Sequence, residues 1–560
     1  MDTHAPTVAD GPVWRREGAM VLMLCLIVFG GYFFRATAIT MRGEEPRRAQ
    51  VAVEMIESGD WIVPREQGDP FLSRPPLQNW LIALCYLVSG ERDCFGARLP
   101  SLVATLAMVL VIYGYGRTFL TPIGALAAGT AFATFGEILQ ECRMAETEAV
   151  FTLLVSGSLL VWHWGMVRGW PEVLAWSLGY GLMALGMLAK SVQAPVYFLV
   201  PVTVFLVLTR QWRRLFSLSH LGGMLVGAAI LAAWVVPYWR QLGFEAVRAI
   251  WTSDVGQRMV EWDGFLTHFV QFPLELFGCM LPWSPLLLAF CNRTFRATIG
   301  GAWPQVLLMA IVLVVGVPTC WIPAHGRTRF LLPLYPCAAV LVGFVAQRCS
   351  EAALDSPLGI GWRRYLKVSA GLMVVAAVAI LAVAWLPSSA AIIRAWAEPP
   401  LTAASFCILL LGLAWLTRNM AAAPGLPQQS LVGILAIAAF MVVLFVGPVI
   451  NVRVRRGNDV PAAFAALKTE LPPDARFVSI GHIHADFPFF YRQQVKPLAI
   501  SGPLKIAEGE YFCFNAYKTA RPTLPFAWQE VKAISVDRNK QEIPVDMLVI
   551  GRRVASHSQR

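Results

Sequence analysis

Two adjacent carboxylates, Glu44 and Glu45, stand in the stretch MRGEEPRRAQ, directly before Pro46. A carboxylate can accept the proton of a nucleophile or hold that nucleophile in place. Acidic residues ahead of a helix also stabilise its positive N-terminus, by about 0.3–1 kcal/mol. This helix effect accounts for one of the two acids better than for both. The pair is therefore a candidate catalytic site, with helix capping as the open alternative.

Lys190 is a cation inside a long apolar stretch, LMALGMLAKSVQAPVYFLVPV. A charged side chain in such surroundings is costly unless it is paired or functional; the alternative is an ammonium that reaches toward the lipid headgroups. Arginine and lysine can hold phosphate oxygens as negative charge develops on them. We expect further ionisable residues at or near the outer ends of the apolar segments, on the same membrane face as Lys190. They are Arg74, Glu146, Glu148, Arg258, Arg327 and Arg329.

Acidic and basic groups at one membrane face suit a reaction in which a nucleophile loses a proton and an anion leaves. Several of these groups also have a structural explanation. Glu146 and Glu148, in ECRMAETEAV, could be the N-terminal acids of a helix. Arg47 and Arg48 could be solvated partners on a helix face, which is the explanation we favour for Arg48.

Other kinds of site have weaker support in the sequence. His482 and His484 lie two apart in GHIHAD, on one face of an expected strand, and two ligands without a third favour surface histidines over a metal site. The eleven cysteines form no CxxC pair, which argues against a zinc site, although a Cys94–Cys142 bridge stays open. No nucleotide-binding glycine loop or nucleophile elbow is present, which argues against ATP-driven transport and serine hydrolysis.

The elements that must position these residues are membrane helices. Of the 560 residues 57% are hydrophobic and 14% charged, so most of the chain must face lipid or fill a membrane bundle. Its net charge of +11 fits basic loops between apolar runs better than nucleic-acid binding. Thirteen spans of about 17–22 residues, enough to cross about 30 Å of hydrocarbon, are expected at residues 20–36, 98–116, 120–138, 149–166, 173–189, 192–208, 220–238, 273–291, 303–321, 329–347, 368–387, 401–417 and 430–450.

Arginines in alternate loops set the expected orientation, with residues 1–19 cytoplasmic and a membrane domain over residues 20–450. The first apolar run lacks a cleavage site and is interpreted as an anchor. Two long outer loops follow, at residues 37–97 and 239–272. In the first, Pro46 begins a helix, and Pro75–Pro76 opens an interfacial helix with Trp80 and Tyr86 at headgroup depth.

Residues 451–560 are expected to form a small α/β domain on the outer, periplasmic face. ARFVSIG and DMLVIG are strand-like runs separated by Pro-rich turns, and VPAAFAALKTEL is typical of a helix. The expected fold class is therefore mainly α, a polytopic membrane protein with about 13 transmembrane helices, outer-face amphipathic helices and this terminal domain. No internal repeat is visible, so the inverted repeats of many transporters are missing.

Five blocks in order resemble one family. GEEPRRAQVAVEMIESGDWIVPREQGDPFLSRPPLQNW is similar to the first outer loop of the polyprenyl-phosphate-dependent membrane glycosyltransferases of the GT-C class, and above all of the bacterial lipid A aminoarabinose transferases and the protein O-mannosyltransferases. CRMAETEAVFTLL, LGMLAKSVQAPV, LFGCMLPWSPLLL and RTRFLLPLYPCAAVL continue the resemblance. It covers most of residues 20–350 and specifies a family but no substrate.

The resemblance implies a role for each matched residue. Glu44 corresponds to the catalytic carboxylate and Glu148 to the acid before the fourth span. We expect both to be catalytic, with Glu44 activating or orienting the acceptor and Glu148 assisting. Lys190 and Arg258 correspond to lipid-phosphate binders, and Arg74 stands where the loop has lysine. The residues that we expect to bind substrate are Glu45, Arg47, Arg74, Lys190, Arg258, Arg327 and Arg329.

Three departures from the family pattern bear on the chemistry. Glu44 and Glu148 stand at positions that are mostly Asp, so each carboxylate has one more methylene. Ser73 stands where many members have a Glu that the resemblance associates with a divalent metal. Its absence argues against a metal at that position, although a divalent metal stays open as an alternative; no other cofactor is implied. Phe330 stands where a tyrosine is usual and lacks its hydroxyl. An altered acceptor or a reduced activity is compatible with these changes.

We therefore expect a glycosyltransferase of the bacterial inner membrane, with a polyprenyl-phosphate sugar donor and an acceptor that is lipid A, another envelope glycan or a protein. Direct displacement with inversion is implied by the resemblance alone. The alternatives are a transporter or flippase of polyprenyl-linked sugars and a catalytically silent scaffold. A glycosidase carboxylate pair suits the converging cations less well than a phosphate leaving group does.

Overall fold

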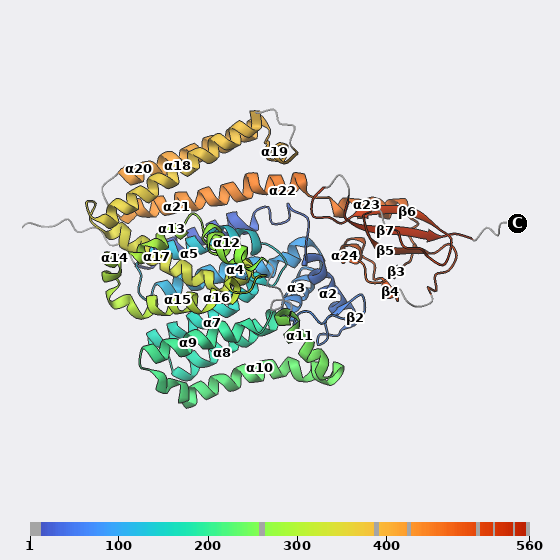
Figure 1. The fold of residues 1–560 in the computed structure, drawn as a ribbon, viewed down its shortest axis with the longest axis horizontal. Coiled ribbons are helices and arrows are strands. Elements are labelled where there is room, and N and C mark those ends of the chain that lie inside the picture. The colour runs from blue at the N-terminus through green and yellow to red at the C-terminus, as the bar shows by residue number, and fades with distance from the viewer. Residues whose placement is uncertain are drawn as a thin grey trace, which may run out of the picture.

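The computed structural model describes residues 13–256, 264–385, 391–422, 427–499, 504–518, 521–540 and 544–555. Long helices run side by side through most of the chain, and a small domain with a β-sheet lies beyond one end of them (Figure 1). The mainly helical fold class with a terminal α/β domain is thereby confirmed.

Nine helical stretches in these described ranges are long and apolar enough to cross a membrane. They are α4 (Cys94–Gly116), α7 (Glu148–Arg168), α8 (Glu172–Ala189), α10 (Leu218–Leu242), α15 with α16 (Trp303–Gly316 and Pro318–Trp321), α17 (Tyr335–Glu351) with the 3-10 turn before it (Thr328–Leu334), α18 (Pro357–Trp385), α20 (Pro400–Ala422) and α21 (Pro427–Leu444) with α22 (Ile450–Arg456).

The count of thirteen spans is not confirmed. Helix α1 (Val13–Val28), α5 (Pro122–Thr134) and α9 (Gln193–Leu208) are apolar but shorter. The segment predicted as 273–291 is a broken one, in which α12 (Phe265–Cys279) and α13 (Ser284–Leu287) meet at a bend of 110°. Prolines at 282 and 285 explain this break, because proline removes a helical hydrogen bond and clashes with the preceding turn.

The first outer loop folds into α2 (Glu45–Ser58), a two-stranded ribbon of β1 (Arg65–Glu66) and β2 (Asp69–Pro70), and α3 (Leu77–Ser89). Pro46 stands in the first turn of α2, as expected, and Gly59 ends the helix in the left-handed conformation. Tyr86 of α3 packs in a core with Ala49 and Val53 of α2. Its ring therefore contributes to the packing of α2 against α3, and its position at headgroup depth stays a prediction.

The terminal domain follows α22 directly. Helix α22 runs to Arg456, so the expected boundary at residues 450 and 451 falls inside a helix. The sheet has the order β4 (Lys496–Leu498), β3 (Phe477–Ile480), β5 (Tyr511–Tyr517), β7 (Asp546–Arg553) and β6 (Trp528–Ser535). Strand β3 is parallel to β4 and β5, whereas β7 is antiparallel to β5 and β6.

Two helices, α23 (Val460–Glu470) and α24 (Asp486–Tyr491), accompany the sheet. Phe464 of α23 and Phe487 of α24 pack with Phe477 of β3 in the core of the domain. The predicted helix and both predicted strands are thus present. The remaining short helices are α6 (Gly136–Glu141), α11 (Phe244–Gly256), α14 (Arg293–Ala297) and α19 (Ala391–Trp396).

Candidate active site

A buried ion pair joins the ends of two membrane helices. Glu148 begins α7 and Lys190 follows the last residue of α8. Lys190 Nζ lies 2.9 Å from Glu148 Oε1, and both side chains are buried. The ammonium also lies 5.5 Å from the ring centre of Phe151 and 5.2 Å from that of Phe330, within the range of cation–π attraction. Lys190 is thus paired inside the protein, which argues against an ammonium reaching toward the headgroups.

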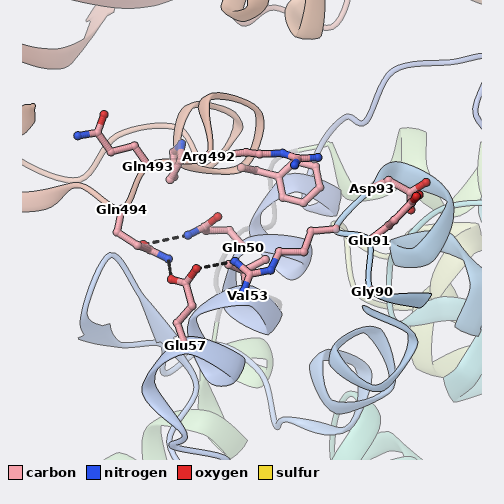
Figure 2. A pocket seen from close by; sticks show the side chains of 12 residues that line it. Gln50, Val53, Glu57, Gly90, Glu91, Asp93, Arg492, Gln493 and Gln494 are labelled. Carbon is pink, nitrogen blue, oxygen red and sulfur yellow. Dashed lines mark hydrogen bonds and ion pairs between the residues drawn. The ribbon is translucent and has the colours of Figure 1, made fainter. Parts of the chain in front are cut away.

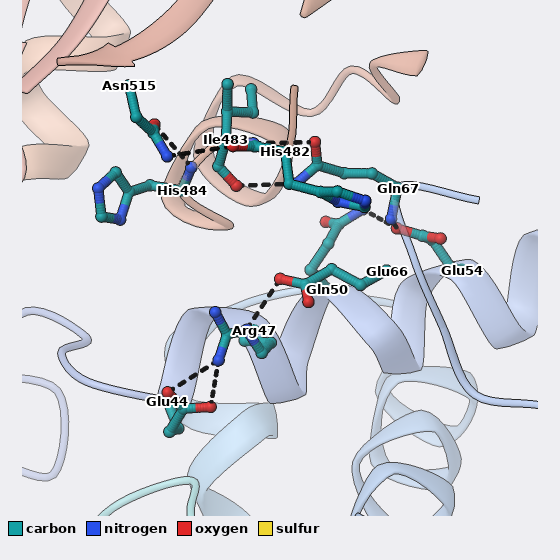
Figure 3. A network of polar contacts seen from close by, with 10 residues as sticks. All are labelled: Glu44, Arg47, Gln50, Glu54, Glu66, Gln67, His482, Ile483, His484 and Asn515. Atoms are coloured by element: carbon teal, nitrogen blue, oxygen red, sulfur yellow. Dashed lines mark hydrogen bonds and ion pairs between the residues drawn. The ribbon is translucent and has the colours of Figure 1, made fainter. Parts of the chain in front are cut away.

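Glu44 lies at the N-terminus of α2 and is held by a neighbouring arginine. Arg47 Nη1 lies 2.7 and 2.9 Å from the two carboxylate oxygens of Glu44, and Arg47 Nε donates to Glu66 Oε1 at 2.8 Å (Figure 3). The Glu44 side chain is 46% exposed. The arginine therefore fixes the direction of a carboxylate that solvent or a substrate can still reach.

Glu45 has a different environment from its neighbour. It is fully buried, and its oxygens accept hydrogen bonds from Arg98 Nε and Nη2 at 2.7 and 2.8 Å. The backbone N–H of Ala145 adds a third, at 2.7 Å. These contacts tie α2 to α4 and to the loop before α7, so the geometry favours a structural role for Glu45. Arg98 was missed from the sequence, although a lone arginine inside an apolar run signals it.

Glu146 is a further acid near Glu45 and Glu148, and it lies in the loop before α7. It is 8% exposed. Burial and the repulsion of Glu148, Glu141 and Glu45 raise the pKa of Glu146 to about 8. This carboxyl group is therefore largely protonated at neutral pH and can donate or accept a proton near that pH.

The terminal domain contacts the loop that carries Glu44 and Glu45. Gly43, at φ +65°, has no Cβ; a Cβ there would lie 2.7 Å from Arg538 Nη2 and 3.3 Å from Glu146 Oε1. Only glycine fits this conformation and this crowding without strain. An arginine of the terminal domain thus lies beside the loop that carries the paired acids.

The arginines that we expected at the site differ in their burial. Arg74 and Arg329 are half-buried, and Arg74 acts electrostatically on Arg48 while Arg329 acts on Glu146. Arg327 is exposed. Arg258 lies outside the described residues. The expectation that Arg48 is solvated is wrong, because its side chain is buried beneath Phe71, 5.3 Å from the ring centre.

The two histidines follow β3 and are not on a strand face as expected, because the strand ends at Ile480. His482 Nε2 lies 2.9 Å from Asp69 Oδ2, and both side chains are exposed. The backbone N–H of His484 donates to Asn515 Oδ1. In the described parts of the chain no three His, Cys, Asp or Glu side chains are grouped as metal ligands.

A polar cleft of about 540 Å³ separates α2 from the terminal domain further along the helix (Figure 2). Gln50 Nε2 donates to Gln494 Oε1 at 3.0 Å, and Gln494 Nε2 donates to Glu57 Oε2 at 2.9 Å. Side chains of α2, the helix that follows Glu44, thus bind the terminal domain directly.

This fold is similar to that of a solved protein. The chain is similar to ArnT from Cupriavidus metallidurans bound to undecaprenyl phosphate, with a TM-score of 0.71, 16% identity and coverage of 95% of this chain and 98% of that one. The apo state of the same protein matches with a TM-score of 0.65. This chain therefore has the same fold as that protein, which agrees with the fold that the sequence resemblance implied.

Sequence comparisons narrow the resemblance. Residues 73–239 match the family of dolichyl-phosphate-mannose-protein mannosyltransferases. The undecaprenyl phosphate-alpha-4-amino-4-deoxy-L-arabinose arabinosyl transferase of Pseudomonas paraeruginosa is 28% identical over 376 residues, which span 64% of this chain and 65% of that protein. A relative with that activity name from Pseudomonas fluorescens is 31% identical over 287 residues, 48% of this chain and 46% of that one. In sequence the chain thus resembles the aminoarabinose transferases.

Proposed function

We propose that this chain is a glycosyltransferase that moves a sugar from a polyprenyl-phosphate donor to an envelope acceptor. The observation that carries the proposal is the buried Lys190–Glu148 pair, with Glu44, Glu146 and the cations Arg48, Arg74 and Arg329 around it. Carboxylates and cations brought together from separate elements suit a reaction that releases a phosphate anion. The fold shared with a protein solved with undecaprenyl phosphate supports the same chemistry.

The transfer forms one bond and breaks one. An acceptor oxygen attacks the anomeric carbon of the sugar, the bond from that carbon to the phosphate oxygen breaks, and the lipid phosphate leaves with the electron pair. If the acceptor is a hydroxyl, its proton passes to a carboxylate, for which Glu44 is our candidate. If the acceptor is an ionised phosphate of lipid A, no base is needed and Glu44 orients the acceptor.

The cations have separate parts in this proposal. Arg74, Lys190 and Arg258 stabilise the negative charge of the leaving lipid phosphate. Glu148 holds Lys190 in place, and Arg47 holds Glu44. The site faces the periplasm, with the N-terminus in the cytoplasm and the terminal domain outside the inner membrane.

The substrates follow from the relatives. The names of the similar Pseudomonas proteins indicate 4-amino-4-deoxy-L-arabinose on undecaprenyl phosphate as donor, and lipid A is the acceptor that we place first. Another envelope glycan or a protein hydroxyl is the alternative acceptor, since residues 73–239 match the protein mannosyltransferase family.

Reconstitution tests the proposal against transport. Purified protein in lipid nanodiscs is supplied with undecaprenyl-phosphate-linked aminoarabinose and lipid A, and the product is measured by mass spectrometry. We expect modified lipid A from the wild type and far less from Glu44→Gln, with Glu57→Gln on the same helix as the matched control. Labelled donor that crosses proteoliposomes while no acceptor is modified would make the chain a transporter and overturn the proposal.

A further inference from the structure

Arg48 is a buried cation with two side-chain nitrogens, Nε and Nη1, that make no hydrogen bond to the described residues. The residue is 4% exposed. The ring of Phe71 covers the guanidinium at 5.3 Å. A cation–π contact offsets only part of the cost of removing such a group from water.

Arg98 shows how this protein satisfies a buried arginine when the role is structural. Its Nε and Nη2 bind both oxygens of Glu45, and its Nη1 donates to the carbonyl oxygens of Ala36 and Ile39 at 2.6 and 2.9 Å. Arg48 lies three residues after Glu45 and has none of these contacts. A buried charge without hydrogen-bond partners destabilises the folded state, so folding alone gives no reason to retain this arginine.

The charged groups around Arg48 do not neutralise it fully, which favours the binding of an anion. The acids that act on it are Glu44, Glu146 and Glu148, and Arg74 acts on it as a like charge. Glu44 is bound to Arg47 and Glu148 to Lys190. Glu146, whose pKa is raised to about 8, carries little charge at neutral pH. Burial and Arg74 lower the pKa of Arg48 to about 10, so the guanidinium stays protonated beside a second cation.

We infer that Arg48 is a further phosphate-binding residue of this site, whose unpartnered N–H groups donate to the oxygens of a phosphate ester. A guanidinium offers several donors in a fixed plane that match phosphate oxygens. The phosphate belongs to a lipid-linked donor or to free phosphate, which share this chemistry. The inference rests on the proposed function, because it assigns a residue to the leaving phosphate of that reaction.

Arg48→Met and Arg98→Met form the matched pair of variants for the test. Thermal unfolding of the detergent-solubilised full-length protein is measured alone and with undecaprenyl phosphate, undecaprenol or inorganic phosphate. We expect Arg48→Met to unfold at or above the wild-type temperature without ligand, since an unpaired charge is removed. Arg98→Met is expected to unfold well below it, because Glu45 is left buried without its partner.

With undecaprenyl phosphate, we expect Arg48→Met to bind roughly 10- to 100-fold more weakly than the wild type, and Arg48→Lys to recover part of the loss. Undecaprenol should bind both proteins equally. If inorganic phosphate alone depends on Arg48, the residue binds free phosphate and the phosphate chemistry still holds.

Two results would overturn the inference by itself: equal undecaprenyl phosphate binding by the wild type and Arg48→Met, or unliganded Arg48→Met that unfolds as early as Arg98→Met. A wild type that binds neither phosphate compound would overturn the proposed function together with it.

Discussion

The ammonium of Lys190 lies 2.9 Å from the carboxylate of Glu148, and this contact joins the end of α8 to the start of α7 inside the protein. Burying two charges carries a desolvation cost that a hydrophobic pair of similar size does not have. A buried ion pair is therefore weak evidence that its role is to stabilise the fold. The aromatic rings next to the ammonium and the charged groups nearby support the proposed role of this pair in a site that binds an anion.

Breaking the pair should separate stability from function. Lys190→Met leaves Glu148 buried without its partner and is expected to cost about 3–5 kcal/mol in unfolding free energy. The double variant Lys190→Met with Glu148→Leu should recover most of that loss while sugar transfer stays absent. Denaturant unfolding and the transfer assay, run on the same preparations, check both statements. A double variant as unstable as the single one would show that the pair does more for stability than we infer.

Arg47 should act as a positioning residue for Glu44. Arg47→Ala removes both hydrogen bonds to that carboxylate, so we expect kcat to fall about 10- to 100-fold with a smaller change in KM, since a misplaced reacting group loses orientation. Glu66→Gln, which removes only the negative charge of the second acceptor of Arg47, should have a weaker effect. Steady-state kinetics on both variants distinguish this role from direct phosphate binding, which would raise KM instead.

Glu146 should make stability depend on pH. Its pKa rises from 4.5 to about 8 on folding, so the folded protein binds the proton more tightly than the unfolded chain. The contribution is fully present below about pH 4.5 and is lost as the pH rises through about 8. Unfolding temperatures measured from pH 5 to 9 should therefore fall less for Glu146→Gln than for the wild type. Parallel curves for the two proteins would contradict the shifted pKa.

Gln67 should hold the terminal domain against the first outer loop. Its side chain donates to the Ile483 carbonyl at 2.7 Å and accepts from the Ile483 N–H at 3.2 Å (Figure 3). Gln67→Ala leaves these buried groups unpaired, at about 1–3 kcal/mol each, and should speed hydrogen exchange in residues 477–491. Asp69→Ala removes only the exposed contact with His482 and should change exchange little.

The residues at the ends of apolar segments could be found from the sequence because two constraints act on them locally. Crossing a membrane fixes segment length, and a lysine such as Lys190 among apolar residues signals a partner or a function. The strands β3 and β7 and the helix α23 could be predicted from the strand-like and helical patterns of their sequences. The break between α12 and α13 was missed because total apolar length hides the effect of two prolines.

Pairings between distant residues could not be predicted in this way. Glu45 and Glu44 are adjacent in sequence, yet one faces Arg98 inside the protein and the other remains half exposed. Helix geometry turns neighbouring side chains to different faces, and the tertiary fold decides what each face meets. The burial of Arg48 depends likewise on Phe71, which the loop brings over it.

The central claim is that Glu44 acts on the acceptor. The most direct test is the rate of sugar transfer from undecaprenyl-phosphate donor to lipid A by Glu44→Gln under saturating substrates, with donor binding measured on the same sample. We predict a rate lower by about 10²–10⁴-fold with donor binding retained, and partial activity for Glu44→Asp, which keeps the charge on a shorter arm. An unchanged transfer rate in Glu44→Gln would contradict the account.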